Sequence, residues 1–126
     1  MRLLLDTHIL LWGLDNDPSL SSQARTLMTD PENDVFVSPI SLWEIAIKVG
    51  LGKLAAAVDK VHKAALESGF IPLPFTFEHA GTVAHLPDHH RDPFDRALIA
   101  QARFEPLILL THDELLASYG DMVLLV

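Results

Sequence analysis

Short runs of consecutive apolar residues alternate along this chain of 126 residues with longer segments of helical character. The runs lie within residues 1–5, 35–37, 70–73, 107–110 and 122–126, and each is short enough to form one strand. Strands without a polar face are typical of a parallel sheet that helices cover on both sides. The pattern predicts an α/β three-layer sandwich with a mainly parallel central sheet, and the length favours a single domain over residues 1–126.

The segments between these runs contain the expected helices. We place them at residues 8–14, from a capping serine at 19, 21 or 22 to about 29, and at 42–49, 55–67, 75–84, 93–104 and 113–117. Pro93 suits the first turn of its helix, where a missing N–H costs little. Pro72 and Pro74 predict that the strand at 70–73 is either an edge strand or a short one, because proline has no N–H to donate to a ladder.

Four acidic residues stand where the apolar segments meet polar boundaries. Asp6 ends the first run, Asp113 follows the run at 107–110, and Glu44 and Asp95 lie near the starts of predicted helices. In an open parallel sheet, strand ends and helix starts converge at one edge. Carboxylates gathered there repel one another unless a cation lies between them, and Mg²⁺ prefers such oxygen ligands. The four acids therefore indicate metal-dependent chemistry on phosphate.

Each of these acids also has a purely structural interpretation as a helix cap. Asp6 could cap the helix that begins after it, and the segment from Thr111 to Glu114 could form another cap. Ser41 and Glu44 fit the capping box S-x-x-E. Asp92, Pro93 and Asp95 fit the N-cap, first and third positions of one helix. The four acids taken together favour the metal interpretation, because four different elements are predicted to bring them to one edge of the sheet.

The composition restricts the class of protein. The chain is 49% hydrophobic with a mean hydropathy of +0.26, which indicates a folded domain with spare apolar surface for a partner or a dimer. It has no cysteine and no apolar run near the roughly 20 residues that span a bilayer, so we expect a soluble cytoplasmic protein. A net charge of -8 argues against non-specific nucleic-acid binding, although a bound metal would offset several acids locally.

Basic and aromatic residues receive mostly structural interpretations. The lysines at 48, 53, 60 and 63 form either a solvated helix face or a surface for RNA or an acidic partner. Arg91 and Arg96 are candidates for phosphate contacts, although Arg96 could pair with an acid. The histidines at 8, 85, 89, 90 and 112 lie mostly in predicted loops, and solvated loop positions are favoured over a zinc site. Trp12 and Trp43 are expected in the core.

At four motifs the chain resembles the PIN-domain ribonucleases, and specifically the VapC-like toxins of bacterial type II toxin–antitoxin pairs. The motifs are Leu4-Leu5-Asp6-Thr7-His8, Ser41-Leu42-Trp43-Glu44-Ile45, the seven residues from His90 to Arg96, and Thr111-His112-Asp113. They occur in this order over nearly the whole length, which makes the combination specific.

The resemblance implies a PIN-like fold and an endoribonuclease that hydrolyses RNA phosphodiester bonds with one or two Mg²⁺ or Mn²⁺ ions. It implies that Asp6, Glu44, Asp95 and Asp113 bind the metal and that Asp92 supports the site. Thr7 and Thr111 match small hydroxyl residues that shape the pocket, whereas His112 stands where many relatives have a small residue. It also implies a homodimer that a cognate antitoxin inhibits by lying across residues 40–70.

Three other functions are weighed against this one. A phosphatase of the haloacid-dehalogenase type needs a second Asp two residues after the strand-end nucleophile, and His8 occupies that position. A phospho-receiver module needs a late lysine, and none follows Lys63. A catalytically inactive regulatory binding module would retain the fold, so only a cleavage assay distinguishes it from the enzyme.

Overall fold

The computed structural model describes residues 1–126 and contains one fully parallel five-stranded sheet. Its strands are β1 (Arg2–Leu5), β2 (Asp34–Val37), β3 (Ile71–Pro72), β4 (Ile108–Thr111) and β5 (Val123–Leu125). The strand order is β3-β2-β1-β4-β5, with β1 in the centre. The predicted α/β fold class is confirmed.

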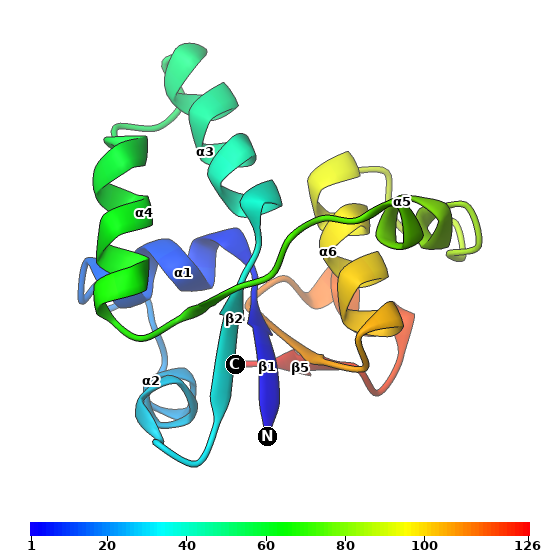
Figure 1. Ribbon diagram of the computed structural model, residues 1–126, viewed down its shortest axis with the longest axis horizontal. Coiled ribbons are helices and arrows are strands. Elements are labelled where there is room, and N and C mark those ends of the chain that lie inside the picture. The colour runs from blue at the N-terminus through cyan, green and yellow to red at the C-terminus, as the bar shows by residue number, and fades with distance from the viewer.

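Helices cover both faces of this sheet (Figure 1). They are α1 (Thr7–Leu14), α2 (Ser22–Thr29), α3 (Pro39–Gly50), α4 (Val58–Glu67), α5 (Phe77–Val83), α6 (Pro93–Phe104) and the 3-10 helix η1 (Glu114–Tyr119). Helices α1, α2 and α4 lie on one side and α5 and α6 on the other, while α3 rises from the carboxyl end of β2. None of the helices has the length and apolar character that a membrane span requires.

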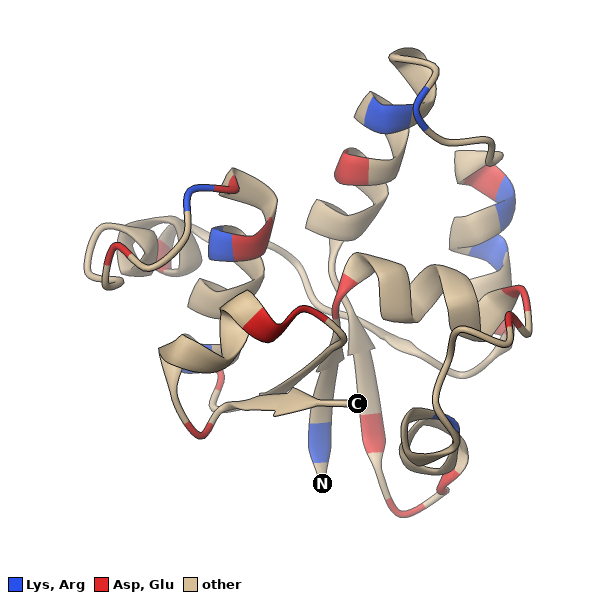
Figure 2. Ribbon diagram, turned by 180° about the vertical axis from the view of Figure 1, so that it is seen from behind, with Lys and Arg blue, Asp and Glu red and all other residues tan.

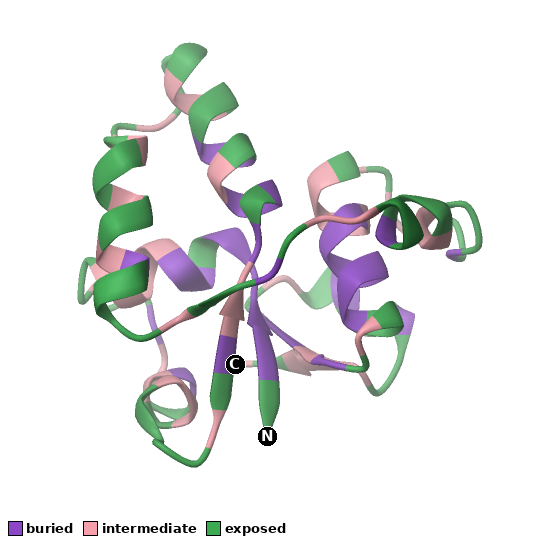
Figure 3. Ribbon diagram, viewed as in Figure 1, coloured by how far each residue is buried: buried purple, intermediate pink, exposed green.

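The central strand β1 supplies side chains to two cores. Leu4 packs into a cluster with Leu98 of α6, whereas Leu3 and Leu5 pack into a second cluster with Leu10 of α1. Successive side chains of a strand point to opposite faces, so one uninterrupted run of leucines serves both layers. Figure 3 shows the resulting buried band through β1 and α6. Each buried leucine contributes roughly 1.5–3 kcal/mol, and together they hold the carboxyl end of β1 in place.

Helix α3 begins earlier than predicted. Ser38 is the N-cap and its Oγ accepts a hydrogen bond from the Ile40 N–H at 3.0 Å, with Pro39 in the first helical position. Ser41 and Glu44 consequently lie inside the helix and are buried. The predicted Ser41–Glu44 capping box is therefore wrong, because proline sets the first turn directly after Ser38.

The other acidic caps are confirmed. Asp6, Asp92 and Asp113 are the N-cap residues of α1, α6 and η1, and each accepts a backbone N–H of its helix. Helix N-termini carry partial positive charge, so they hold carboxylates at low cost. The caps place three acids at helix starts around the ends of β1 and β4.

Several boundaries differ from the predictions. The strand expected at 70–73 pairs only at Ile71 and Pro72, and it lies at the sheet edge as the prolines predicted. Helix α5 begins at Phe77 because Thr76 and His79 form a capping box, in which each side chain accepts the other's backbone N–H. Helix α4 begins at Val58, after an extended Ala57.

Candidate active site

A pocket of about 280 Å³ opens at the carboxyl end of the sheet. Ten residues line it: Asp6, His8, Trp12, Glu44, Lys48, His90, Asp92, Asp95, His112 and Asp113. The four acids singled out in the sequence are all among them. In Figure 2 the acidic segments on α3 and α6 and at the start of α1 lie around this end of β1.

Asp6 is fixed on both sides at the end of β1. It is only 7% exposed, and its two carboxylate oxygens accept from the Thr7 N–H at 2.7 Å and from the Thr111 hydroxyl at 2.6 Å. Burial raises the pKa of Asp6, and the hydrogen bonds from Thr111 and Thr7 oppose this in part. Thr7 and Thr111 therefore hold the carboxylate in one orientation, which agrees with their predicted role in shaping the pocket.

Glu44 faces the same pocket from the second turn of α3. It is 4% exposed, and its Oε1 accepts from the Thr7 hydroxyl at 2.7 Å. Its Oε2 forms an ion pair with Nζ of Lys48, one helical turn further along. The hydrogen bond with Glu44 raises the pKa of Lys48, against the effect of partial burial. Lys48 is thus the one lysine that lines the pocket, and it is paired with a pocket acid.

Asp95 lies in the first turn of α6, beside the cap residue Asp92. The Asp92 Oδ1 accepts from the N–H groups of Phe94 and Asp95 at 2.8 and 3.2 Å. The Asp95 Oδ2 lies 2.8 Å from Nε2 of His90. The pKa of Asp95 is raised to about 7, mainly by burial and next by the charge of Asp6, and the hydrogen bond with His90 opposes the rise. The carboxylates of Asp6 and Asp95 therefore repel each other, as expected for acids gathered at one edge of the sheet.

The donor atoms of this pocket suit a divalent cation. One ligand atom each from His90, Asp95 and Asp113 lie within 4.8 Å of one another. Five carboxylates and one lysine line the pocket, so its side chains leave an excess of negative charge. Oxygen-rich sites of this kind favour Mg²⁺ or Mn²⁺, and an imidazole nitrogen is more compatible with Mn²⁺.

Comparison with known proteins assigns the chain to a family. The family model described as PIN domain matches residues 3–121. The chain belongs to the PIN domain family. No curated protein sequence matches it.

Solved structures share the fold of this PIN domain. It is similar to a structure of VapBC2 from Rickettsia felis bound to a promoter DNA fragment, with 17% identity, a TM-score of 0.69 and coverage of 99% of this chain and 97% of that one. A toxin–antitoxin complex from Klebsiella pneumoniae has 18% identity, a TM-score of 0.67 and coverage of 97% and 95%. FitAcB from Neisseria gonorrhoeae has 20% identity, a TM-score of 0.61 and coverage of 96% and 95%. At these identities the likeness establishes a PIN fold.

His90 and Lys48 are among the residues lining the pocket of this PIN domain that sequence reasoning missed. His90 is not a solvated loop residue as predicted, because its ring is half-buried and bonded to Asp95. Its position in the same motif as Asp92 and Asp95 could have indicated that His90 belongs to the pocket. Lys48 is predicted on a solvated helix face or on a surface for RNA or an acidic partner. It lies four residues after Glu44, a spacing that places both side chains on one helix face and could have indicated its pairing with Glu44.

Two further predictions are corrected by the structure. Arg96 pairs with no acid; its guanidinium donates to the main-chain oxygens of Val83, Pro87 and His90 and to the Tyr119 hydroxyl. Its several N–H donors suit a cluster of carbonyl groups, so Arg96 anchors the loop before α6. Trp43 is 54% exposed and packs edge-on against Phe94 at 4.9 Å between ring centroids, so it is not a core residue.

Proposed function

We propose that this PIN domain is a metal-dependent endoribonuclease and the toxin of a toxin–antitoxin pair. The convergence of Asp6, Glu44, Asp95 and Asp113 from four separate elements in one pocket is the observation that carries the proposal. Membership of the PIN domain family supports nuclease activity. The pocket lining includes no serine, threonine or cysteine that could act as a nucleophile.

Asp6, Glu44, Asp95 and Asp113 would hold Mg²⁺ or Mn²⁺. When bound, such an ion supplies activation of a water molecule for attack on phosphorus and offsets the charge of the phosphate. Asp6 is oriented for this role by Thr7 and Thr111, and Asp95 by His90. Glu44 is held by Thr7 and Lys48. These supporting contacts matter because outer-shell partners orient metal ligands.

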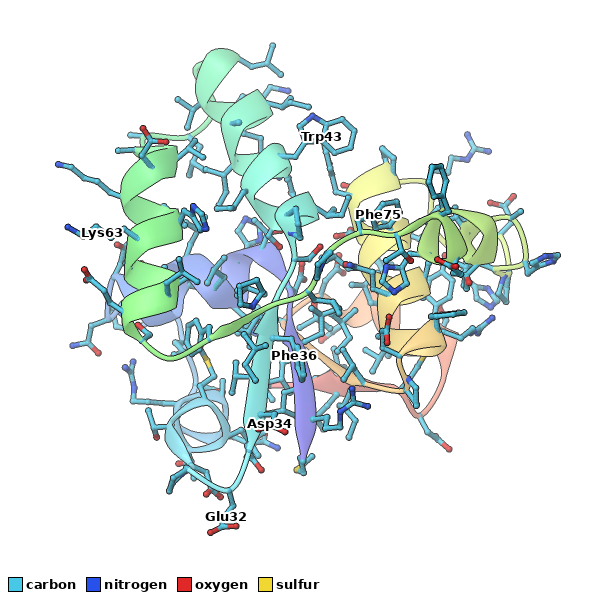
Figure 4. The ribbon with its side chains drawn as sticks, viewed as in Figure 1. Glu32, Asp34, Phe36, Trp43, Lys63 and Phe75 are labelled. Atoms are coloured by element: carbon cyan, nitrogen blue, oxygen red, sulfur yellow. The ribbon has the colours of Figure 1, made fainter.

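The helix pair α3 and α4 offers a surface for the antitoxin. Ile47 of α3, Leu51 at its C-cap, Leu66 of α4 and Ile71 of β3 are exposed apolar side chains. A small cavity of about 70 Å³ between the two helices is lined by Leu42, Leu66 and neighbouring residues. Figure 4 shows Lys63 extending away from α4, at the outer side of this surface. The similarity to a structure described as a toxin–antitoxin complex supports an antitoxin partner, and the exposed apolar side chains are our reason for placing it here.

The proposed activity is tested by incubating purified protein with labelled single-stranded and structured RNAs in Mg²⁺, Mn²⁺ or EDTA. We expect cleavage with either metal and none in EDTA. Absence of cleavage by a protein shown to be folded would favour the alternative, a catalytically inactive regulatory binding module.

We expect the isolated protein to form a homodimer. Ten large apolar side chains are exposed, Trp43, Leu51 and Phe77 among them, and such surface suits contact with a second copy of the chain. Light scattering at micromolar concentration should give twice the mass of 13.9 kDa. A monomeric mass under these conditions would contradict the dimer and leave the proposed catalysis unaffected.

Replacing Lys48 by methionine should strengthen metal binding. The substitution removes a positive charge from the pocket and frees Oε2 of Glu44, so we expect roughly threefold to tenfold tighter Mn²⁺ binding by calorimetry, about 0.7–1.4 kcal/mol. Lys63→Met is the matched control, since Lys63 pairs at the same spacing with Glu67 on an exposed surface. Weaker Mn²⁺ binding by Lys48→Met would show that Lys48 helps to assemble the metal site.

A further inference from the structure

The acidic pocket has one aromatic wall. His8 and Trp12 lie four residues apart on α1, and His112 follows β4. The rings of His8 and Trp12 are stacked with centroids 5.6 Å apart and planes at 15°, and His112 meets Trp12 edge-on at 5.4 Å. All three residues line the same pocket as Asp6 and Asp113. The three rings are called the aromatic wall below.

The aromatic wall is held firmly and yet remains open to solvent. Trp12 is half-buried and packs against the core cluster beneath α1. His112 is oriented by a hydrogen bond of 3.0 Å from its Nδ1 to the main-chain oxygen of Val126. His8 and His112 are themselves exposed. Core packing therefore accounts for one side of Trp12, whereas neither histidine ring is buried in a core.

The chemistry of the wall suits a nucleobase. The wall contains no Lys, Arg, Asp or Glu. It therefore has no such charged side chain with which to bind a phosphate. Proteins that bind single-stranded nucleic acid combine a groove that binds the backbone with aromatic rings on which the bases stack. Every base has a face that can stack in this way. A base paired within a helix is already stacked and cannot be splayed onto such a surface without cost.

We propose that the aromatic wall stacks a nucleobase of a single-stranded segment next to the phosphate in the acidic pocket, an inference that rests on the proposed nuclease function. His8 and His112 contact the base, and Trp12 positions both rings through its contacts with them. The wall therefore selects unpaired over paired substrate at this position.

Tryptophan fluorescence tests the wall without metal or cleavage. The chain has two tryptophans, so Trp43→Phe leaves Trp12 as the reporter. The probe is a single-stranded methylphosphonate oligonucleotide in EDTA, because its uncharged backbone is neither repelled by the acids nor a phosphodiester. We expect saturable quenching of Trp12, and binding about fivefold to 100-fold weaker when the bases are absent from the same backbone.

Substitutions of the histidines complete the test. His8→Ala and His112→Ala should each weaken probe binding about fivefold or more, and should raise KM for single-stranded RNA while largely sparing kcat. His85→Ala is the matched control, since His85 is exposed and does not line the pocket. No quenching, equal quenching by the abasic backbone, or unaffected histidine variants would overturn the aromatic wall.

The two proposals fail in distinguishable ways. Quenching by the base-bearing probe without any RNA cleavage would contradict the nuclease and support the wall. Metal-dependent cleavage with unchanged KM in His8→Ala and His112→Ala would contradict the wall alone.

Discussion

Asp6→Asn is expected to abolish metal-dependent RNA cleavage, with a loss greater than about 100-fold. Loss of an outer-shell partner of a metal ligand already costs about 10–100-fold, and Asp6 is proposed to bind the metal directly. The amide retains an oxygen for the Thr7 N–H and has almost the same shape, but it lacks the negative charge. Initial rates on a cleavable RNA at saturating Mn²⁺ measure the effect.

The fold should survive Asp6→Asn. Burial raises the pKa of Asp6, so ionisation of this carboxyl costs the metal-free fold more than it costs the unfolded chain. A neutral amide removes that penalty, and we expect a metal-free melting temperature equal to or above that of the wild type. Asp121→Asn is the control, because Asp121 is exposed and lies outside the pocket. Cleavage at the wild-type rate by a folded Asp6→Asn protein would refute the metal-site assignment.

Stabilisation of the protein by metal should depend strongly on pH. Asp95 has a pKa of about 7 in the metal-free fold, well above its ordinary value of 3.8. A carboxyl with a raised folded-state pKa destabilises the fold progressively as pH rises from about 4 to 7, since the unfolded chain ionises first. A cation needs the ionised form. At pH 5.5, where most of Asp95 is protonated, the apparent metal affinity should be roughly 30-fold lower than above pH 7.

Thermal unfolding with and without Mn²⁺ measures this linkage. At a metal concentration of 100 times Kd, binding contributes about 2.7 kcal/mol, which corresponds to a rise in Tm of roughly 5–15 °C at pH 7.5. The rise should be much smaller at pH 5.5 at the same metal concentration. In Asp95→Asn, we expect a higher metal-free Tm at pH 7.5 and little response to Mn²⁺. An equal rise in Tm at both pH values would place the metal away from Asp95.

Local sequence patterns predicted much of this protein because they act over short distances. The uninterrupted leucines of residues 3–5 predicted a buried strand, and that strand lies at the centre of a parallel sheet. The caps at Asp6, Asp92 and Asp113 were also predicted, since a cap needs only its own helix start. The rule that strand ends converge at one edge was sufficient to expect four acids in one place.

Side chains whose partners lie far along the chain were predicted less well. Glu44 also fitted a cap, but Pro39 starts the helix earlier, and the hydroxyl of Thr7, 37 residues away, donates a hydrogen bond to Glu44 in the pocket. Arg96 appeared to be a partner for an acid, but loop carbonyls and Tyr119 surround its guanidinium. In each case several local roles were compatible with the sequence, and the packing selected one.

The sequence by itself determined the fold class, the strand and helix order and the identity of the four acids, because apolar periodicity and helix capping are local properties of the chain. Only the tertiary structure decided that His90 bonds Asp95, that Lys48 enters the pocket with Glu44, and that His8, Trp12 and His112 form one wall. Those contacts depend on how separate elements pack at the carboxyl end of the sheet, where distances between side chains are set by both cores together.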